Sequence, residues 1–241
     1  MIRVAGGLRL VNCAGAGGKY TNAQIDDYAG LPRRRFRWRP PVTMTLRARF
    51  SVGGEQLAGT AGFGFWNDPF LMTGWRTPAP PRALWFFFAA PPSNMALAQD
   101  VPGYGWKAAT IDALSPAVMV AGPLAAALWL LRRPKLRRRL WPRLQRAFGV
   151  DEAIVPAPME LWHTYVIEWQ TDLVRFVVDG ESVLETARSP RGSLGFVLWI
   201  DNQWLAITPD GAFGAGVTSL AQRQWLEIAD LEIRHDTAYS R

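Results

Sequence analysis

Two short segments of the chain place a tryptophan and an aspartate in the same spacing. Trp66 and Asp68 are two positions apart, and Trp199 and Asp201 repeat this W-x-D pattern. Side chains two apart on a strand point to one face, so each pair sets an aromatic ring beside a carboxylate. If both strands lie in one concave sheet, both pairs are expected at the same end of a groove. Such a groove could hold a sugar or another ring, with Asp68 and Asp201 as acid–base groups.

These acids also have a purely structural interpretation. Asp68 precedes Pro69 and Asp201 precedes Asn202, and an aspartate in such a place commonly closes a strand by bonding to the loop backbone. Hydrolysis of a glycoside would in addition require two carboxyls about 5–5.5 Å apart for retention or about 6.5–9.5 Å apart for inversion. The neighbouring asparagines, Asn67 and Asn202, are predicted to contact the same ligand.

The run from 84 to 90 supplies further aromatic side chains. It reads Leu-Trp-Phe-Phe-Phe-Ala-Ala and is apolar on both faces, as in an inner strand covered on each side. Trp85 and Phe87 share one face, and the other face is expected to pack in the core. Because apolar pockets with a few polar groups suit lipophilic ligands, we predict such a groove, walled by Trp66, Trp85, Phe87 and Trp199 and edged by Tyr20, Asn22 and Gln24.

Other catalytic and metal-binding patterns receive no support from the sequence. Two histidines, His163 and His235, and one cysteine, Cys13, do not make a zinc motif. There is no Gly-x-Ser-x-Gly nucleophile motif. We therefore predict no metal and no cofactor. A single cysteine allows no intramolecular disulfide, so nothing marks an oxidising compartment.

Short strands must position the candidate residues. The clearest is 42–50, where apolar and polar side chains alternate with period two. Asp179-Gly180 is a strong hairpin signal between two such runs. Repeated short strands separated by Pro/Gly breaks predict one all-β domain over 1–241, a sandwich of two antiparallel sheets. The predicted strands are 42–50, 62–68, 84–88, 162–169, 173–178, 182–186, 194–200 and 225–233.

One segment departs from this pattern and predicts a helical insertion near 114–150. Sixteen residues from Pro116 to Leu131 carry no charge, and eight cations follow between 132 and 146. Because a transmembrane helix needs about 20 apolar residues, a membrane span is disfavoured. An apolar arm beside a basic amphipathic helix is typical of an interfacial anchor, although it could instead pack on the sandwich. The predicted membrane contacts are Leu128, Trp129, Leu130, Arg137, Arg138 and Trp141.

The charge of the chain is concentrated in that segment. The net charge is +7, but outside 132–146 nineteen cations face twenty acids. A near-neutral remainder argues against nucleic acid as a partner, so an acidic partner is expected to meet 132–146 alone. Residues 1–18 lack the sustained apolar core of a signal peptide. We therefore predict a cytoplasmic protein, peripheral on a membrane.

Several segments in the C-terminal third resemble a known family. Residues 162–169 read W-H-T-Y-V-I-E-W, a V-D-G turn follows at 178–180, and an aromatic and a closing strand follow at 194–199 and 225–233. In order and spacing they resemble bacterial laminarinases, lichenases and related concanavalin A-like lectin/glucanases. The resemblance implies a jelly roll with a concave, sugar-binding sheet. The family's E-x-D-x-x-E strand is best matched here by 84–90, which has no acid, so the usual retaining mechanism is not implied.

Three functions fit this sequence. The first is a membrane-surface protein that binds an amphiphilic or lipophilic ligand in an aromatic groove, with or without transforming it. The second is a diverged glycoside hydrolase or a carbohydrate-binding lectin. The third is a non-catalytic interaction module that docks an acidic partner. Any catalysis is expected to use aspartate acid–base chemistry of a hydrolase-like or isomerase/cyclase-like kind, and the oligomeric state is not predicted.

Overall fold

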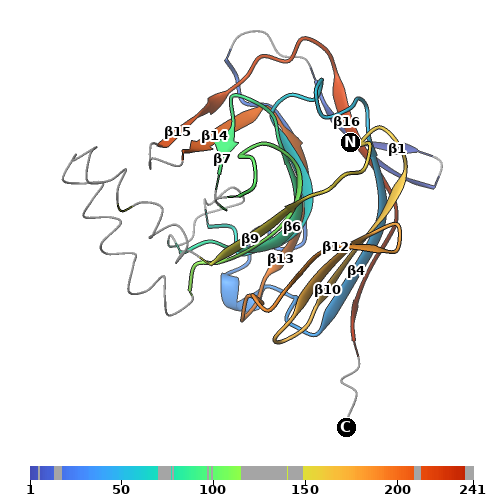
Figure 1. Cartoon of the computed structure of the whole chain (residues 1–241). Helices are drawn as coiled ribbons and strands as arrows, with labels where there is room; N and C mark the ends of the chain where they lie inside the picture. The colour runs from blue at the N-terminus through green and yellow to red at the C-terminus, as the bar shows by residue number, and fades with distance from the viewer. Residues whose placement is uncertain are drawn as a thin grey trace.

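The chain forms two large antiparallel sheets that pack face to face (Figure 1). The computed structural model describes residues 1–4, 6–13, 18–69, 77, 79–96, 98, 100–114, 140, 149–208 and 213–236. This architecture confirms the predicted jelly-roll sandwich.

The first sheet has seven strands in the order β1-β2-β16-β4-β10-β11-β12. Its central pairs join strands far apart in the sequence, because β4 pairs with both β10 and β16. The predicted hairpin is confirmed at Asp179-Gly180, between β11 and β12. The strands are β1 (Ile2–Val4), β2 (Gly7–Asn12), β4 (Val42–Phe50), β10 (His163–Trp169), β11 (Val174–Val178), β12 (Glu181–Thr186) and β16 (Gln224–His235).

The second sheet has six strands in the order β3-β13-β5-β6-β8-β9, and a small third sheet has the order β15-β14-β7. Figure 1 shows β7 and β14 beside the six-stranded sheet, on its concave face, which points away from the other large sheet. The strands are β3 (Asn22–Asp26), β5 (Thr60–Trp66), β6 (Arg82–Ala89), β7 (Asn94–Met95), β8 (Gly105–Asp112), β9 (Val150–Ile154), β13 (Gly195–Asp201), β14 (Gln203–Ile207) and β15 (Phe213–Val217), and Arg33–Arg35 form one 3-10 turn, η1.

The core lies between the two large sheets and follows the period-two pattern. On β4 the alternate residues Val42, Met44, Leu46, Ala48 and Phe50 are all buried. On β6 both faces are buried, as predicted, and they belong to different clusters. Phe86 and Phe88 pack in the central core, whereas Trp85 and Phe87 pack in a second cluster on the concave face.

The predicted insertion connects two neighbouring strands. β8 and β9 are paired, and the Asp112 amide donates to the Gly149 carbonyl at 2.9 Å, so the chain leaves and returns at one point of the sheet. Apart from residue 140, residues 115–148 lie outside the described residues, and with them the predicted helix and the six predicted membrane contacts. Within the described part of the chain, no helix is long and apolar enough to cross a membrane.

Candidate functional site

Two glycines on β5 leave room on the concave face of the six-stranded sheet. Gly62 pairs directly with Trp199 of β13, and Gly64 pairs with Trp85 of β6. A Cβ atom at Gly62 would lie 2.8 Å from the Trp199 ring, and one at Gly64 would lie 2.7 Å from the Trp85 Cβ. Both are closer than side-chain packing allows. The indole of Trp199 therefore lies where β5 offers no side chain.

The four predicted aromatic walls form one cluster on this face. Ring centroids are 5.8 Å apart for Trp66 and Trp85, and 5.5 Å apart for Trp85 and Phe87. Trp199 closes the group, 5.5 Å from Trp85 and 6.0 Å from Phe87. These separations are typical of interacting aromatic pairs. Each of these residues is between 6% and 9% exposed, so the rings do not form an open platform.

This aromatic pocket has a polar end. The aromatic walls meet Asp201, Thr60, Gln24 and Gln203 there. The cavity measures about 110 Å³, near the roughly 150 Å³ of an engineered apolar cavity that binds benzene and well below the roughly 300–1,000 Å³ of drug-sized sites. It therefore suits one ring-sized group. Gln203 and the further lining residues Met95 and Leu205 were not predicted, because they come from the small sheet, whose packing against the concave face has no local sequence signal.

Asp201 is the carboxyl of the aromatic pocket, and it is only 4% exposed. Its Oδ1 accepts hydrogen bonds from the Thr60 hydroxyl at 2.8 Å and the Gln203 amide at 3.1 Å, and its Oδ2 accepts one from the Gln203 side chain at 3.2 Å. Burial raises the pKa of Asp201 to about 6, although these donors act to lower it. The group therefore changes charge close to neutral pH.

The predicted groove edge adjoins this carboxyl. Burial raises the pKa of the Tyr20 hydroxyl, and the nearby Asp201 carboxylate raises it further. Gln24 lies two residues after Asn22 on β3 and lines the aromatic pocket itself. The Trp199 indole donates to the Thr60 hydroxyl at 3.0 Å, which ties the aromatic wall to the polar end.

The expectation that the two W-x-D pairs meet at one end is wrong. β5 and β13 are antiparallel, with Asp201 opposite Thr60 and Trp66 opposite Gly195. The two motifs therefore run in opposite directions, so their aspartates lie far apart although both tryptophans line the aromatic pocket. Thr60 and Trp66 are six residues apart, which is roughly 20 Å along a strand. Asp68, beyond Trp66, is fully buried and does not line the aromatic pocket.

The two predicted ligand asparagines also lie outside the pocket lining. Asn67 Oδ1 accepts from the Arg82 amide at 2.9 Å, and its Nδ2 donates to the Pro80 carbonyl at 2.9 Å. Asn202 accepts from the Thr21 amide and donates to two backbone carbonyls. Both side chains hold loops together through hydrogen bonds to the backbone. This is the structural role predicted as the alternative for the neighbouring Asp68 and Asp201.

The described residues offer the aromatic pocket no pair of acids. Asp201 is the one carboxylate among the described residues that line it, and glycoside hydrolysis requires two. In the described part of the chain no group of three His, Cys, Asp or Glu side chains could hold a metal ion. His163 lies on the other sheet, where its ring nitrogens face Asp179 Oδ2 at 2.5 Å and the Pro158 carbonyl at 2.9 Å. The described lining of the aromatic pocket therefore does not present the two carboxyls of a glycoside hydrolase.

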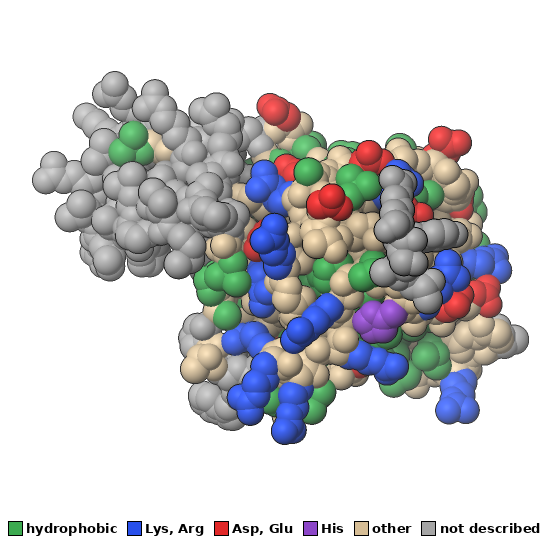
Figure 2. Space-filling view, turned by 90° about the horizontal axis from the view of Figure 1, so that it is seen from below, with side chains coloured by type: hydrophobic (Ala, Val, Ile, Leu, Met, Phe, Trp, Pro, Cys, Tyr) green, Lys and Arg blue, Asp and Glu red, His purple; other side chains and the backbone are tan. Residues whose placement is uncertain are grey.

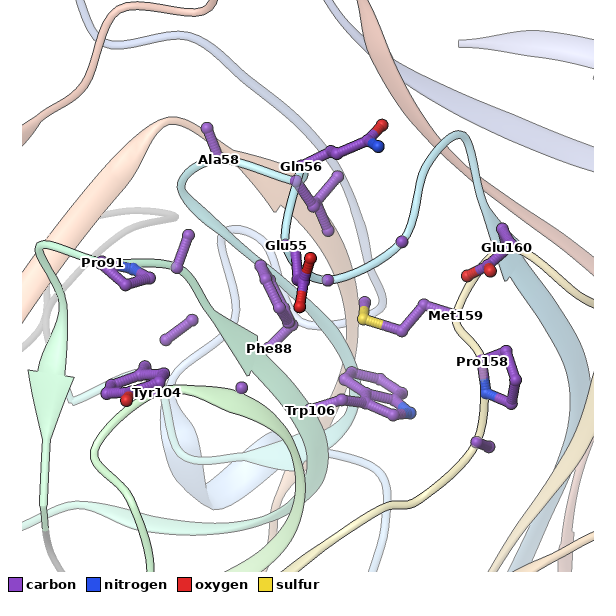
Figure 3. A pocket seen from close by; sticks show the side chains of 17 residues that line it. Glu55, Gln56, Ala58, Phe88, Pro91, Tyr104, Trp106, Pro158, Met159 and Glu160 are labelled. Carbon is purple, nitrogen blue, oxygen red and sulfur yellow. The ribbon is translucent and has the colours of Figure 1, made fainter.

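A second and larger hollow opens at one end of the sandwich (Figure 3). It measures about 940 Å³ and is formed by the loops that follow β4, β6 and β9. Phe88, Trp106 and Met159 form an apolar floor, and the exposed carboxylates of Glu55 and Glu160 stand at its rim. These acids come from loops without a recognisable motif, so they could not be predicted from local pattern.

Several solved structures are similar to this chain at low sequence identity. No protein-family model and no curated protein sequence matches the chain. Similar solved structures include a glycoside hydrolase family protein from Mycobacterium thermorestibile, at 10% identity, a TM-score of 0.48 and coverage of 95% of this chain and 76% of that one. Two others have 13% identity, a TM-score of 0.48 and coverage of 95% of this chain. They are the Crh5 transglycosylase in complex with NAG, covered over 73% of its chain, and the carbohydrate recognition domain of Emp47p, covered over 83%. At these identities, nothing about the activity of those proteins carries over to this chain.

Proposed function

We propose that the aromatic pocket binds a small amphiphilic ligand. A ring-sized apolar part lies among Trp85, Phe87 and Trp199, and a polar group meets Asp201 and Gln203. One observation supports this more than any other: four aromatic walls and a buried carboxyl with a raised pKa line the same small cavity. Apolar walls with few polar groups are characteristic of such ligand sites.

The size and chemistry of the pocket restrict the ligand. A cavity of about 110 Å³ does not enclose a long acyl chain, so a longer ligand would leave most of its length outside. Below a pH of about 6 the protonated Asp201 can donate a hydrogen bond, and above it the carboxylate only accepts. A ligand with a hydroxyl group suits both states. Because amphiphiles of this kind partition into membranes, the proposal keeps the predicted cytoplasmic, membrane-surface location.

A second candidate is the binding of one sugar ring, as in a lectin. Two side-chain amides, of Gln24 and Gln203, lie beside Asp201 at the polar end, and amides and carboxylates are natural partners for sugar hydroxyls. The aromatic walls would contact the apolar face of the ring. No hydrolytic step belongs to this candidate, because the described lining supplies a single carboxyl.

Calorimetric titration separates the two candidates. The probes are 4-ethylphenol for the amphiphile and methyl β-glucoside for the sugar, each added to the full chain. Trp199→Ala is expected to weaken binding at least tenfold, about 1.4 kcal/mol, because it removes one wall. The matched control is Trp225→Ala, a tryptophan on the other sheet.

The outcomes are distinct. Binding of the phenol that is lost in Trp199→Ala and kept in Trp225→Ala supports the amphiphile. Binding of the glucoside alone, with the same response to the variants, supports the sugar instead. Binding of neither probe at millimolar concentration, or equal losses in the two variants, would refute the assignment of this pocket.

A further inference from the structure

A run of arginines alternates with buried aromatic rings at one end of the sandwich. Residues 33–39 read Arg-Arg-Arg-Phe-Arg-Trp-Arg. Phe36 and Trp38 are 4% and 5% exposed, and the side chains on either side of them point outward. The exposed members are Arg34, Arg35, Arg37 and Arg39, which we call the arginine face.

The backbone beneath the arginine face is firmly held. Trp38 exchanges two backbone hydrogen bonds with Leu194, at 3.0 and 2.9 Å, and its indole donates to Asp27 at 2.6 Å. The Phe36 ring packs 4.9 Å from the Tyr28 ring, centroid to centroid. Because these anchors fix the chain, the guanidinium groups are presented together with little further loss of backbone entropy on binding.

Other arginines gather at the same end. Arg39 donates to Ser193 at 2.7 Å, close to the exposed Arg191. Arg82 bonds to the Arg191 carbonyl. Burial lowers the pKa of Arg82, the Asp112 carboxylate acts to raise it, and the positive charge of Arg33 acts to lower it. Figure 2 views the molecule from below. Many Lys and Arg side chains gather in the lower left part of the described surface, whereas most Asp and Glu side chains lie in its upper and right parts.

Among the described residues no carboxylate forms an ion pair with the arginine face, although the charge of Arg37 acts on the nearby Asp27. The nearby Asp27 is half-buried and occupied by the Trp38 indole. The positive charge at this end is therefore available to an external anion.

We propose that the arginine face docks the protein on an anionic lipid surface. Each arginine near such a surface contributes about 1 kcal/mol, which is roughly a fivefold gain in partitioning. Single-stranded nucleic acid is the weaker fit, because its bases need exposed aromatic rings for stacking, and Phe36 and Trp38 are buried. A charged bilayer needs only the guanidinium groups. This inference does not depend on what the aromatic pocket binds.

The finding corrects the sequence-based view of charge. The chain outside 132–146 is near neutral in total, yet its charges are segregated, so 132–146 is not the sole basic segment. The signal was present in the sequence as five arginines within residues 33–39. The net charge summed over all residues outside 132–146 does not reveal this local cluster.

Vesicle co-sedimentation tests the proposal on the full chain. The vesicles are phosphatidylcholine alone, or phosphatidylcholine with phosphatidylserine. The triple variant Arg34→Gln, Arg35→Gln, Arg37→Gln is expected to lower partitioning to the anionic vesicles about 100-fold. The matched control removes three charges elsewhere on the surface, through Arg175→Gln, Arg223→Gln and Arg234→Gln, and is expected to change partitioning less than fivefold.

Each outcome decides the matter. A salt-sensitive loss confined to the first triple variant, with an unchanged melting temperature, supports the docking face. Equal losses in both triple variants would show that only the total charge acts. Full binding by the first variant would assign the contact to another segment, such as 132–146. Tight binding of single-stranded RNA without vesicle binding would assign the face to nucleic acid. Each of the last three results overturns the proposal.

Discussion

Replacing Asp201 with asparagine is expected to change how the stability of the protein depends on pH. The carboxyl is 4% exposed, and burial raises its pKa from 3.8 to about 6. The folded protein therefore binds the proton more tightly than the unfolded chain. Stability from this group is fully present below the unfolded pKa, near 4, and is lost as the pH rises through about 6.

The size of the effect follows from the shift. A difference of about two pKa units, at 1.36 kcal/mol per unit, amounts to about 3 kcal/mol. In Asp201→Asn the side chain is neutral at every pH, while an oxygen still accepts from Thr60 or Gln203. The variant is therefore expected to gain about 3 kcal/mol relative to the natural protein between about pH 4 and about pH 7.5.

Urea unfolding across that pH range measures this gain directly. The quantity to plot is the free energy of unfolding of the variant minus that of the natural protein. Asp27 and Glu152, whose pKa values are also raised by burial, are present in both proteins and cancel. Asp172→Asn, a change at an exposed aspartate, serves as the control. A difference for Asp201→Asn that does not vary with pH, or that matches the control, would refute the reasoning.

Two further substitutions test the concave face. Gly62→Ala places a Cβ atom against the Phe86 carbonyl oxygen of the neighbouring strand and 2.8 Å from the Trp199 ring, so we expect thermal unfolding to show a loss of about 1–3 kcal/mol together with weaker ligand binding. Lys107 is fully buried, with Nζ 3.1 Å from Glu152 Oε1. Lys107→Met leaves that acid buried without its cation and is expected to cost about 3–5 kcal/mol. Adding Glu152→Gln to Lys107→Met should restore part of the loss in the same assay, and no restoration would contradict the ion-pair explanation.

The local alternation of apolar and polar residues was sufficient to predict the strands. Alternation along 42–50 gives β4 its buried face, and the all-apolar run at 84–88 becomes an inner strand covered on both sides. Asp179 and Gly180 form the turn of a hairpin, with φ angles of 51° and 89°, because these residue types tolerate the left-handed region. Strand formation and the face of each side chain depend on neighbours in sequence, so they were predictable.

Register was not predictable from those patterns. Each W-x-D motif specifies a face of its own strand but not the direction of that strand relative to the other. The antiparallel pairing of β5 with β13 separated Asp68 from Asp201. The packing of β14 against the concave face likewise brought Gln203 to the polar end. Both depend on contacts between segments far apart in the chain.

The sequence by itself determined which side chains share a face: Trp66 with its two glycines, Trp85 with Phe87, and Trp199 with Asp201. The tertiary structure decided which of those faces meet. It joined the four aromatic rings over the side-chain-free positions of β5 and left Asp201 as the one carboxyl among the described lining residues. It also brought Arg82 and Arg191, which are distant in sequence, to the end of the sandwich that carries the arginine face. The physical reason is that the two-residue period of a strand is a local property, whereas burial, pKa and charge segregation arise only when distant strands pack.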